Sequence, residues 1–100
     1  MFLTKDPVEF VWHYAKDRNG NMVYKKQTLQ RRIEAHFKYK TCRIIFDQDD
    51  SICAVCLWNI SPDAKTAEVT DMVIREDYRK KDMIRKILIK VKFFYRLLEY

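Results

Sequence analysis

Residues 71–90 read DMVIREDYRKKDMIRKILIK, an apolar strand that leads through a short charged loop into a basic amphipathic helix. The first amides of a helix are unpaired and point outward, so a junction of this kind often binds phosphate. Here the loop has no glycine and carries Asp82 near the start of the predicted helix. The stretch therefore raises the question of whether the loop still leaves room for an anion.

The N-terminal segment predicts a helix over residues 6–20. Asp6 is a good capping residue, Pro7 suits the first helical position, and Gly20 suits a helix end. Four apolar residues recur at helical spacing on its buried side: Val8, Val11, Trp12 and Ala15.

A second helix is predicted within residues 21–40. The sequence leaves two starting points open, one near Met22 and one near Thr28. The apolar residues of this helix recur at every fourth position, at Leu29, Ile33 and Phe37.

After residue 40 the hydrophobic period changes to that of strands. Residues 42–60 predict two strands around a turn at 48–51, which reads QDDS. Residues 66–74 predict a third strand with two faces. One face carries Ala67, Val69, Asp71 and Val73, and the other carries Glu68, Thr70, Met72 and Ile74. The order α-α-β-β-β-α predicts an α+β domain, with helices packed on an antiparallel three-stranded sheet.

Length and charge limit the class of protein and its partners. The 100 residues predict a single domain spanning residues 1–100. The 20 Lys and Arg residues exceed the 14 Asp and Glu residues, and the net charge of +6 favours anionic partners such as nucleic acid. A soluble surface with a basic bias explains the same charge. No segment has the pattern of a signal peptide or of a membrane span, so we expect a cytoplasmic protein with no membrane partner.

The residues that commonly bind metals do not form a metal-binding pattern. Cys53 and Cys56 are three apart in a predicted strand and so face opposite sides of it. We therefore expect reduced thiols in the core of a cytosolic protein, and no metal. His13 and His36 lie on the predicted N-terminal helices with no cysteine or carboxylate at the spacing of a nucleophile and its base. Neither histidine is therefore a catalytic candidate.

Residues 67–88, AEVTDMVIREDYRKKDMIRKIL, resemble the GNAT superfamily of acyl-CoA-dependent N-acyltransferases. The similarity lies in the hydropathy of the strand and loop, in the Tyr78–Arg79 pair and in the preceding α-α-β-β order, and it spans about residues 7–95. It implies that the loop and the start of the last helix bind the pyrophosphate of acetyl-CoA. The positions that it places there are Ile74, Arg79, Lys80, Lys81, Asp82 and Ile84. It also makes Glu68, on the preceding strand, the candidate general base.

The loop departs from the family pattern at two positions. The family has Gly at position 82 and Gly or Ala at position 84, whereas this chain has Asp82 and Ile84. Glycine lets the backbone approach a pyrophosphate closely, and both larger side chains oppose that approach. Asp82 is also an anion and a good N-cap, so we expect it to replace the charge of the cofactor and to leave the protein without one. Five cations at positions 79, 80, 81, 85 and 86 keep acetyl-CoA binding as an alternative.

The last predicted helix is apolar on two sides, one of which faces the sheet. The residues of the second side are Ile89, Phe93, Phe94, Leu97 and Tyr100. Such a helix needs two partners, and the third predicted strand also leaves a free edge. We therefore expect a homo-oligomer or docking on another protein, unless the first two helices cover the second side. In the family, a further strand and helix complete the cofactor slot, and here another chain would have to supply them.

The sequence thus predicts a degenerate GNAT-like domain that serves as a non-catalytic, self-associating structural or interaction module. Its small size, its many lysines and its single glycine would suit a viral protein. One alternative is an acetyl-CoA-dependent N-acetyltransferase completed by dimerisation. The other is a nucleic-acid-binding module in which the basic side of the last helix, including Lys86 and Lys90, contacts phosphates.

Overall fold

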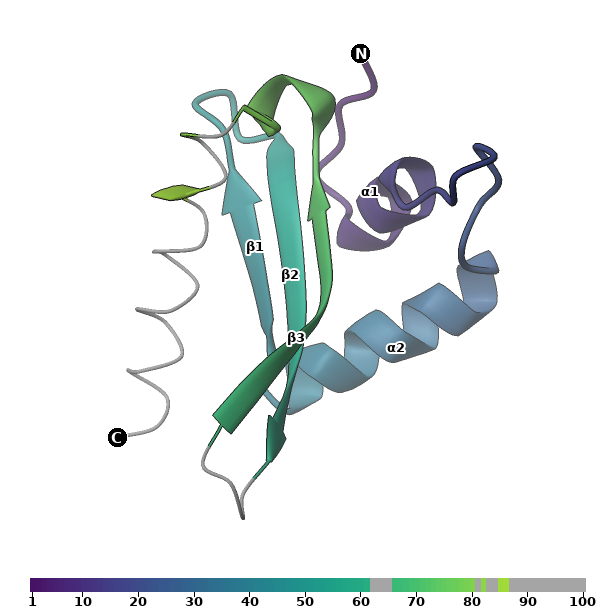
Figure 1. Cartoon of the computed structure of the whole chain (residues 1–100), viewed down its shortest axis with the longest axis vertical. Helices are drawn as coiled ribbons and strands as arrows, with labels where there is room; N and C mark the ends of the chain where they lie inside the picture. Colours follow the sequence, from purple (N-terminus) through teal and green to yellow (C-terminus); the bar gives the residue numbers. More distant parts are fainter. Residues whose placement is uncertain (62–65, 81, 83–84, 87–100) are drawn as a thin grey trace.

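The computed structural model of the protein describes residues 1–61, 66–80, 82 and 85–86. Its elements are α1 (Pro7–Tyr14), α2 (Lys26–Lys38), β1 (Cys42–Phe46), β2 (Ile52–Ser61), β3 (Thr66–Ile74) and the 3₁₀ helix η1 (Glu76–Tyr78). The strands pair antiparallel in the order β1-β2-β3 (Figure 1). This arrangement confirms the predicted α+β class and the antiparallel three-stranded sheet. Residues 82, 85 and 86 are helical, and the rest of the predicted last helix lies outside the described residues.

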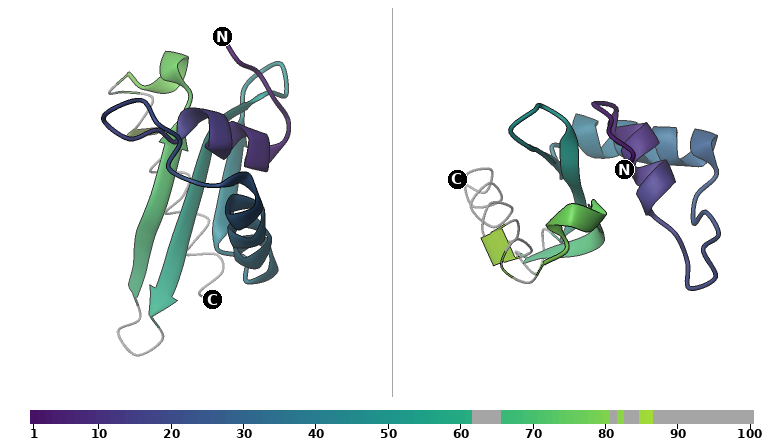
Figure 2. Two further views of the ribbon diagram at one scale, coloured as in Figure 1. Left: turned by 90° about the vertical axis from the view of Figure 1, so that its right-hand side faces the viewer. Right: turned by 90° about the horizontal axis from the view of Figure 1, so that it is seen from above.

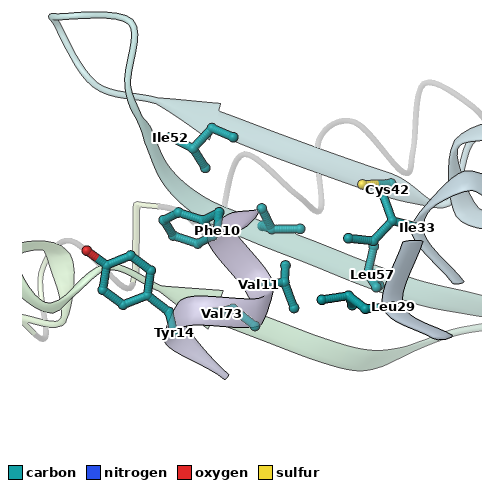
Figure 3. Packing of buried hydrophobic residues seen from close by; sticks show 10 residues of the cluster. Phe10, Val11, Tyr14, Leu29, Ile33, Cys42, Ile52, Leu57 and Val73 are labelled. Carbon is teal, nitrogen blue, oxygen red and sulfur yellow. The ribbon is translucent and has the colours of Figure 1, made fainter. Parts of the chain in front are cut away.

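Both helices cover the same face of the sheet (Figure 2). Phe10 and Val11 of α1, and Leu29 and Ile33 of α2, are at most 1% exposed. They pack against a row of strand residues, Cys42, Ile52, Val55, Leu57 and Val73 (Figure 3). Full burial of a large apolar side chain contributes roughly 1.5–3 kcal/mol, so this cluster holds the helices to the sheet.

The predicted buried side of α2 is only partly right. Leu29 and Ile33 are buried as predicted, but Phe37 is 47% exposed. A repeat of four residues drifts around a helix whose turn takes 3.6 residues, so the third apolar position leaves the core face. His36 occupies that face instead, and its Nδ1 lies 2.7 Å from the hydroxyl oxygen of Thr41. Burial lowers the pKa of His36 below its ordinary value.

α1 begins where it was predicted to begin but ends earlier. The carboxylate of Asp6 accepts hydrogen bonds from two amides of the first turn, which confirms the predicted cap. The helix ends at Tyr14 because Ala15 has extended backbone. Gly20, with φ of +79°, serves the loop after the helix and not the helix end.

β3 contains a bulge at Thr70 that breaks the predicted alternation of its side chains. Leu57 of β2 pairs with Asp71, whereas the next residue, Trp58, pairs with Val69. Thr70 is therefore the extra residue of a β-bulge. Cross-strand partners share a face of the sheet, so Val69 lies on the face of Trp58 and Asp71 on the face of Leu57. The prediction that Val69 and Asp71 share one face is wrong for this reason.

The three cysteines are free and buried. Cys53 and Cys56 lie in separate clusters of buried side chains, and the thiol of Cys53 donates to the carbonyl of Ile45. Burial raises the pKa of Cys42 to about 11 and that of Cys56 to about 12. The thiols of Cys42 and Cys56 are therefore protonated at neutral pH, which is typical of structural core thiols.

Arg75, directly after β3, is a buried charged residue with a side chain only 3% exposed. Its guanidinium pairs with Asp77 (Nε–Oδ1, 2.6 Å) and Asp47 (Nη2–Oδ2, 2.9 Å), and it donates to the carbonyl of Ile52. The hydrogen bond to Asp77 is the main cause that raises the pKa of Arg75, which stays charged. One side chain thus joins the turn between β1 and β2 to the segment after β3.

We predict that Arg75→Met lowers the free energy of unfolding by about 3–5 kcal/mol, because two carboxylates and a carbonyl then lose their buried cation. Urea denaturation followed by circular dichroism measures the change. Arg31→Met is the matched control, since it removes the same charge from an exposed position of α2 and should change stability by no more than about 0.5 kcal/mol. Equal effects of the two substitutions would contradict a structural role for Arg75.

Candidate functional site

The candidate site is the outer edge of β3, a strand whose only described neighbour in the sheet is β2. Two hydrogen bonds show which backbone groups face outward. The amide of Arg75 donates to the carbonyl of Cys53, so these two residues hydrogen-bond across β2 and β3. The amide of Trp58 donates to the carbonyl of Thr41, on the side of β1. Hydrogen bonds alternate along an antiparallel pair, and both observations give the same alternation.

This alternation divides the β3 edge into two halves on either side of the bulge. In the pocket half, between the bulge and the strand end, Met72 and Ile74 turn their N–H and C=O groups away from β2. In the distal half, Ala67 and Val69 do the same. Thr70 separates the two halves, so each can bind a different partner.

A pocket of about 500 Å³ lies along the pocket half. Residues 70–74 of β3 form one wall, and residues 14–16 and 23–24, before and after the α1–α2 loop, form the other. Arg79 also lines the pocket. A volume of this size is typical of sites for small ligands.

The loop between α1 and α2 is held in shape by its own hydrogen bonds. One oxygen of the Asp17 carboxylate accepts from the amides of Asn19 and Asn21, at 2.9 Å each. Lys16 and Met22 form a β-bridge across the loop. The wall of the pocket opposite β3 is therefore preformed by contacts within the chain.

Asp71 is the charged centre of the pocket and is fully engaged by α2 and the preceding loop. The hydroxyl of Tyr24 donates to Oδ1 of Asp71 at 2.7 Å, and the guanidinium of Arg32 pairs with Oδ2. Arg32 also donates to the hydroxyl of Thr70, because the bulge turns both residues toward α2. The structure thus places a half-buried ion pair beside the bulge.

These contacts set the protonation states in the pocket. Burial alone would raise the pKa of Asp71, but the hydrogen bonds from Tyr24 and Arg32 outweigh burial and lower it. Burial and the neighbouring Asp71 raise the pKa of Tyr24. Asp71 is therefore ionised and Tyr24 protonated at neutral pH, so neither is poised to transfer a proton. This arrangement suits binding better than acid–base catalysis.

Arg79 is anchored at the end of the pocket where β3 ends. Its Nε donates to the carbonyl of Ile74 at 2.6 Å, and its side chain is otherwise exposed. A neutral carbonyl orients the guanidinium without cancelling its charge. The pocket therefore has a fixed cation at the Ile74 end and a compensated carboxylate at the bulge end.

The structure brings only part of the predicted cofactor-binding set together. Ile74 and Arg79 line the pocket, while Lys80 and Asp82 are exposed and do not line it. Asp82 is helical, but residues 81, 83 and 84 at the start of this helix lie outside the described residues, so the cap stays a prediction. Lys81 and Ile84 lie outside the described residues.

The other predicted site residues lie away from the pocket or outside the described residues. Glu68 is exposed, pairs across the sheet with Asn59 and does not line the pocket. Lys86 is exposed, and Lys90 lies outside the described residues, so nucleic-acid binding stays a prediction. The predicted interface residues, Ile89, Phe93, Phe94, Leu97 and Tyr100, also lie outside the described residues.

Sequence reasoning missed Tyr24, Arg32 and the loop wall as parts of the site. Asp71 was the available signal, since it is a charged residue within an otherwise apolar strand end. A charge that is half-buried in a strand needs a partner, and the nearest candidates lie on another element. The bulge determines which element supplies the partner, and the sequence pattern does not reveal the bulge.

No family model, curated protein or solved structure matches the chain. Among the described residues, no helix combines the length and the hydropathy needed to cross a membrane. In the same part of the chain, no group of three His, Cys, Asp or Glu residues is arranged to hold a metal ion. The geometry of the β3 edge is therefore the basis for the function proposed below.

We predict that Asp71→Asn removes a pH-dependent part of the stability. The pKa of Asp71 is lower in the folded chain, so its contribution is present above the unfolded pKa and is lost as pH falls through the folded pKa. The wild type should exceed the variant by about 1–3 kcal/mol at pH 7, and the difference should shrink towards pH 3. Urea denaturation at both pH values measures it, with the exposed Asp49→Asn as control. A difference that stays constant with pH would contradict the assignment.

Proposed function

We propose that the chain is a non-catalytic, GNAT-like interaction module that self-associates through the distal half of the β3 edge. The observation that carries the proposal is the outward direction of the backbone groups of Ala67 and Val69. An edge of this kind is a template for pairing with another strand. Main-chain hydrogen bonds then provide affinity, and the side chains provide specificity.

The composition of β3 supports this use of its edge. Proteins usually blunt free edges with lysine or proline. The chain has 20 Lys and Arg residues, yet residues 66–74 contain neither of these residue types and no proline. Val69 is 47% exposed and Ile60, on the adjacent strand, is 44% exposed. Residues 66–74 of the edge thus lack lysine and proline, and apolar side chains flank the distal half.

A second copy of the chain fits this edge by symmetry. Two antiparallel β3 strands related by a two-fold axis form an isologous contact, in which the same patch serves both subunits. With the axis at Glu68, Ala67 of each copy pairs with Val69 of the other, so the contact uses both outward residues and stays within the distal half. Glu68 then faces its own counterpart, and this like-charge contact limits the affinity of the pairing.

We predict that the wild-type protein is dimeric and that Val69→Pro weakens the dimer by about tenfold or more. Proline removes an outward N–H that the intramolecular ladder does not use, and edge strands tolerate it at such positions. Light scattering on a concentration series measures the dissociation, and circular dichroism checks the fold. Val69→Thr is the matched control, because it keeps both the N–H and the branched side chain. A wild type that is monomeric throughout, or a Val69→Pro dimer of unchanged affinity, would refute the proposal.

A second candidate function is an acetyl-CoA-dependent N-acetyltransferase completed by dimerisation. It is favoured by one observation, the position of the pocket beside Ile74 and Arg79. These are two of the positions that the GNAT resemblance associates with the cofactor. Two observations stand against it: the loop has Asp82 and Ile84, and Glu68 does not line the pocket.

We expect calorimetric titration of acetyl-CoA into the protein to show no binding at millimolar ligand, because the loop lacks the glycines that admit a pyrophosphate. Asp82→Gly combined with Ile84→Ala restores the small residues and serves as the comparison variant. Micromolar binding to the wild type would favour the acetyltransferase instead.

A further inference from the structure

We propose that the pocket half of the β3 edge binds the C-terminal carboxylate of a short extended peptide, with Arg79 as the carboxylate-binding residue. The inference rests on the proposed role of β3 as a pairing edge, but it uses the residues on the other side of the bulge. The ligand is defined by its chemistry: an extended chain of amides that ends in one carboxylate.

The backbone of the pocket half supplies the hydrogen bonds for such a chain. Met72 presents both an N–H and a C=O group to the pocket, and Ile74 presents an N–H group. A ligand that is only apolar would leave these groups without partners, at a cost in binding free energy. A peptide segment satisfies them by adding a strand to the sheet.

Arg79 supplies the charge that selects the end of the peptide. Its Nε is committed to the carbonyl of Ile74, which fixes the plane of the guanidinium beside the outward N–H of the same residue. A guanidinium offers two parallel N–H donors that match the two oxygens of a carboxylate. Together with the nearby amide, this arrangement suits one planar anion.

The charges along the pocket also set the direction of the peptide. Asp71, at the bulge end, already pairs with Arg32, so that end has no uncompensated cation for a second carboxylate. Arg79 and Lys16 place positive charge elsewhere on the lining, with Arg79 at the Ile74 end. A peptide whose carboxylate lies at Arg79 therefore runs parallel to β3.

The remaining walls can accept small side chains. Ala15 and Val23 line the side opposite the strand, and Val73 lines the strand side. Successive side chains of an extended peptide point to opposite sides, so one of them would lie against this apolar wall. The volume of about 500 Å³ accommodates a few residues and not a folded domain.

The test uses an N-acetylated tripeptide of one alanine and two valines with a free carboxylate, and the same peptide with a C-terminal amide. Titration into the full chain is followed by NMR at the amides of Met72 and Ile74. The carboxylate form should bind with a millimolar or lower dissociation constant and the amide form roughly tenfold or more weakly. Arg79→Gln should abolish this difference. Arg31→Gln, the same change on the exposed side of α2, should leave it intact.

Several results would overturn the assignment. They are equal affinity for the acid and the amide, no shift at Met72 or Ile74 with either peptide, or unchanged discrimination in Arg79→Gln once circular dichroism shows that the variant is folded. Val69→Pro separates the two proposals. It should weaken the dimer and leave peptide binding unchanged, because Val69 lies beyond the bulge. Failure of peptide binding in a protein that still dimerises would refute this inference alone.

Discussion

The bulge at Thr70 is the constraint on which the rest of the described structure depends. It adds one residue to β3, so that Thr70 and Asp71 both direct their side chains to Arg32 of α2. Strict alternation would send one of these two side chains to the opposite face of the sheet. The bulge therefore ties α2 to the middle of β3. It also divides the outer edge into two halves, one of which borders the pocket.

Two arginines close to the end of β3 have opposite roles, and their surroundings explain why. Arg75 is buried, and its guanidinium pairs with Asp47 and Asp77 and donates to a carbonyl. These contacts compensate its charge and join the turn between β1 and β2 to the segment after β3. Arg79 is exposed and its Nε contacts only a neutral carbonyl, that of Ile74. The first arginine fixes the segment from which the second projects. Arg75 in this way positions Arg79, the residue that we propose to bind the carboxylate.

The sequence predicted the class of fold because its strongest patterns are local. The cap at Asp6, the change of hydrophobic period after residue 40 and the turn at residues 48–51 each depend on neighbouring residues. The predictions were wrong where tertiary contacts determine which face of a helix or strand a side chain occupies. His36 replaced Phe37 on the buried side of α2, because the sheet selects the true helical face. The bulge changed the face of Val69, and no local pattern marks a bulge.

The candidate site was harder to predict, because its parts come from three segments that are far apart in the sequence. The resemblance pointed to the loop after β3, and two of the residues that it named, Ile74 and Arg79, line the pocket. It gave no reason to consider Tyr24 or Arg32, whose relation to Asp71 depends on how α2 crosses the sheet. The sequence also does not show which backbone groups face outward along an edge, because every residue except proline has the same N–H and C=O groups.

The residues that oppose a pyrophosphate do not oppose a smaller anion. A pyrophosphate needs several amides at close range, and the sequence predicts that Asp82 and Ile84 oppose that approach in the loop. A single carboxylate needs only one planar donor pair and one nearby amide, and both are found at Arg79 and Ile74, on the strand side of the loop. In the proposed assignment, the anion is bound at the strand edge and not in the loop. The pocket at the strand edge is therefore consistent with the proposed binding of a peptide, which does not require glycines in the loop.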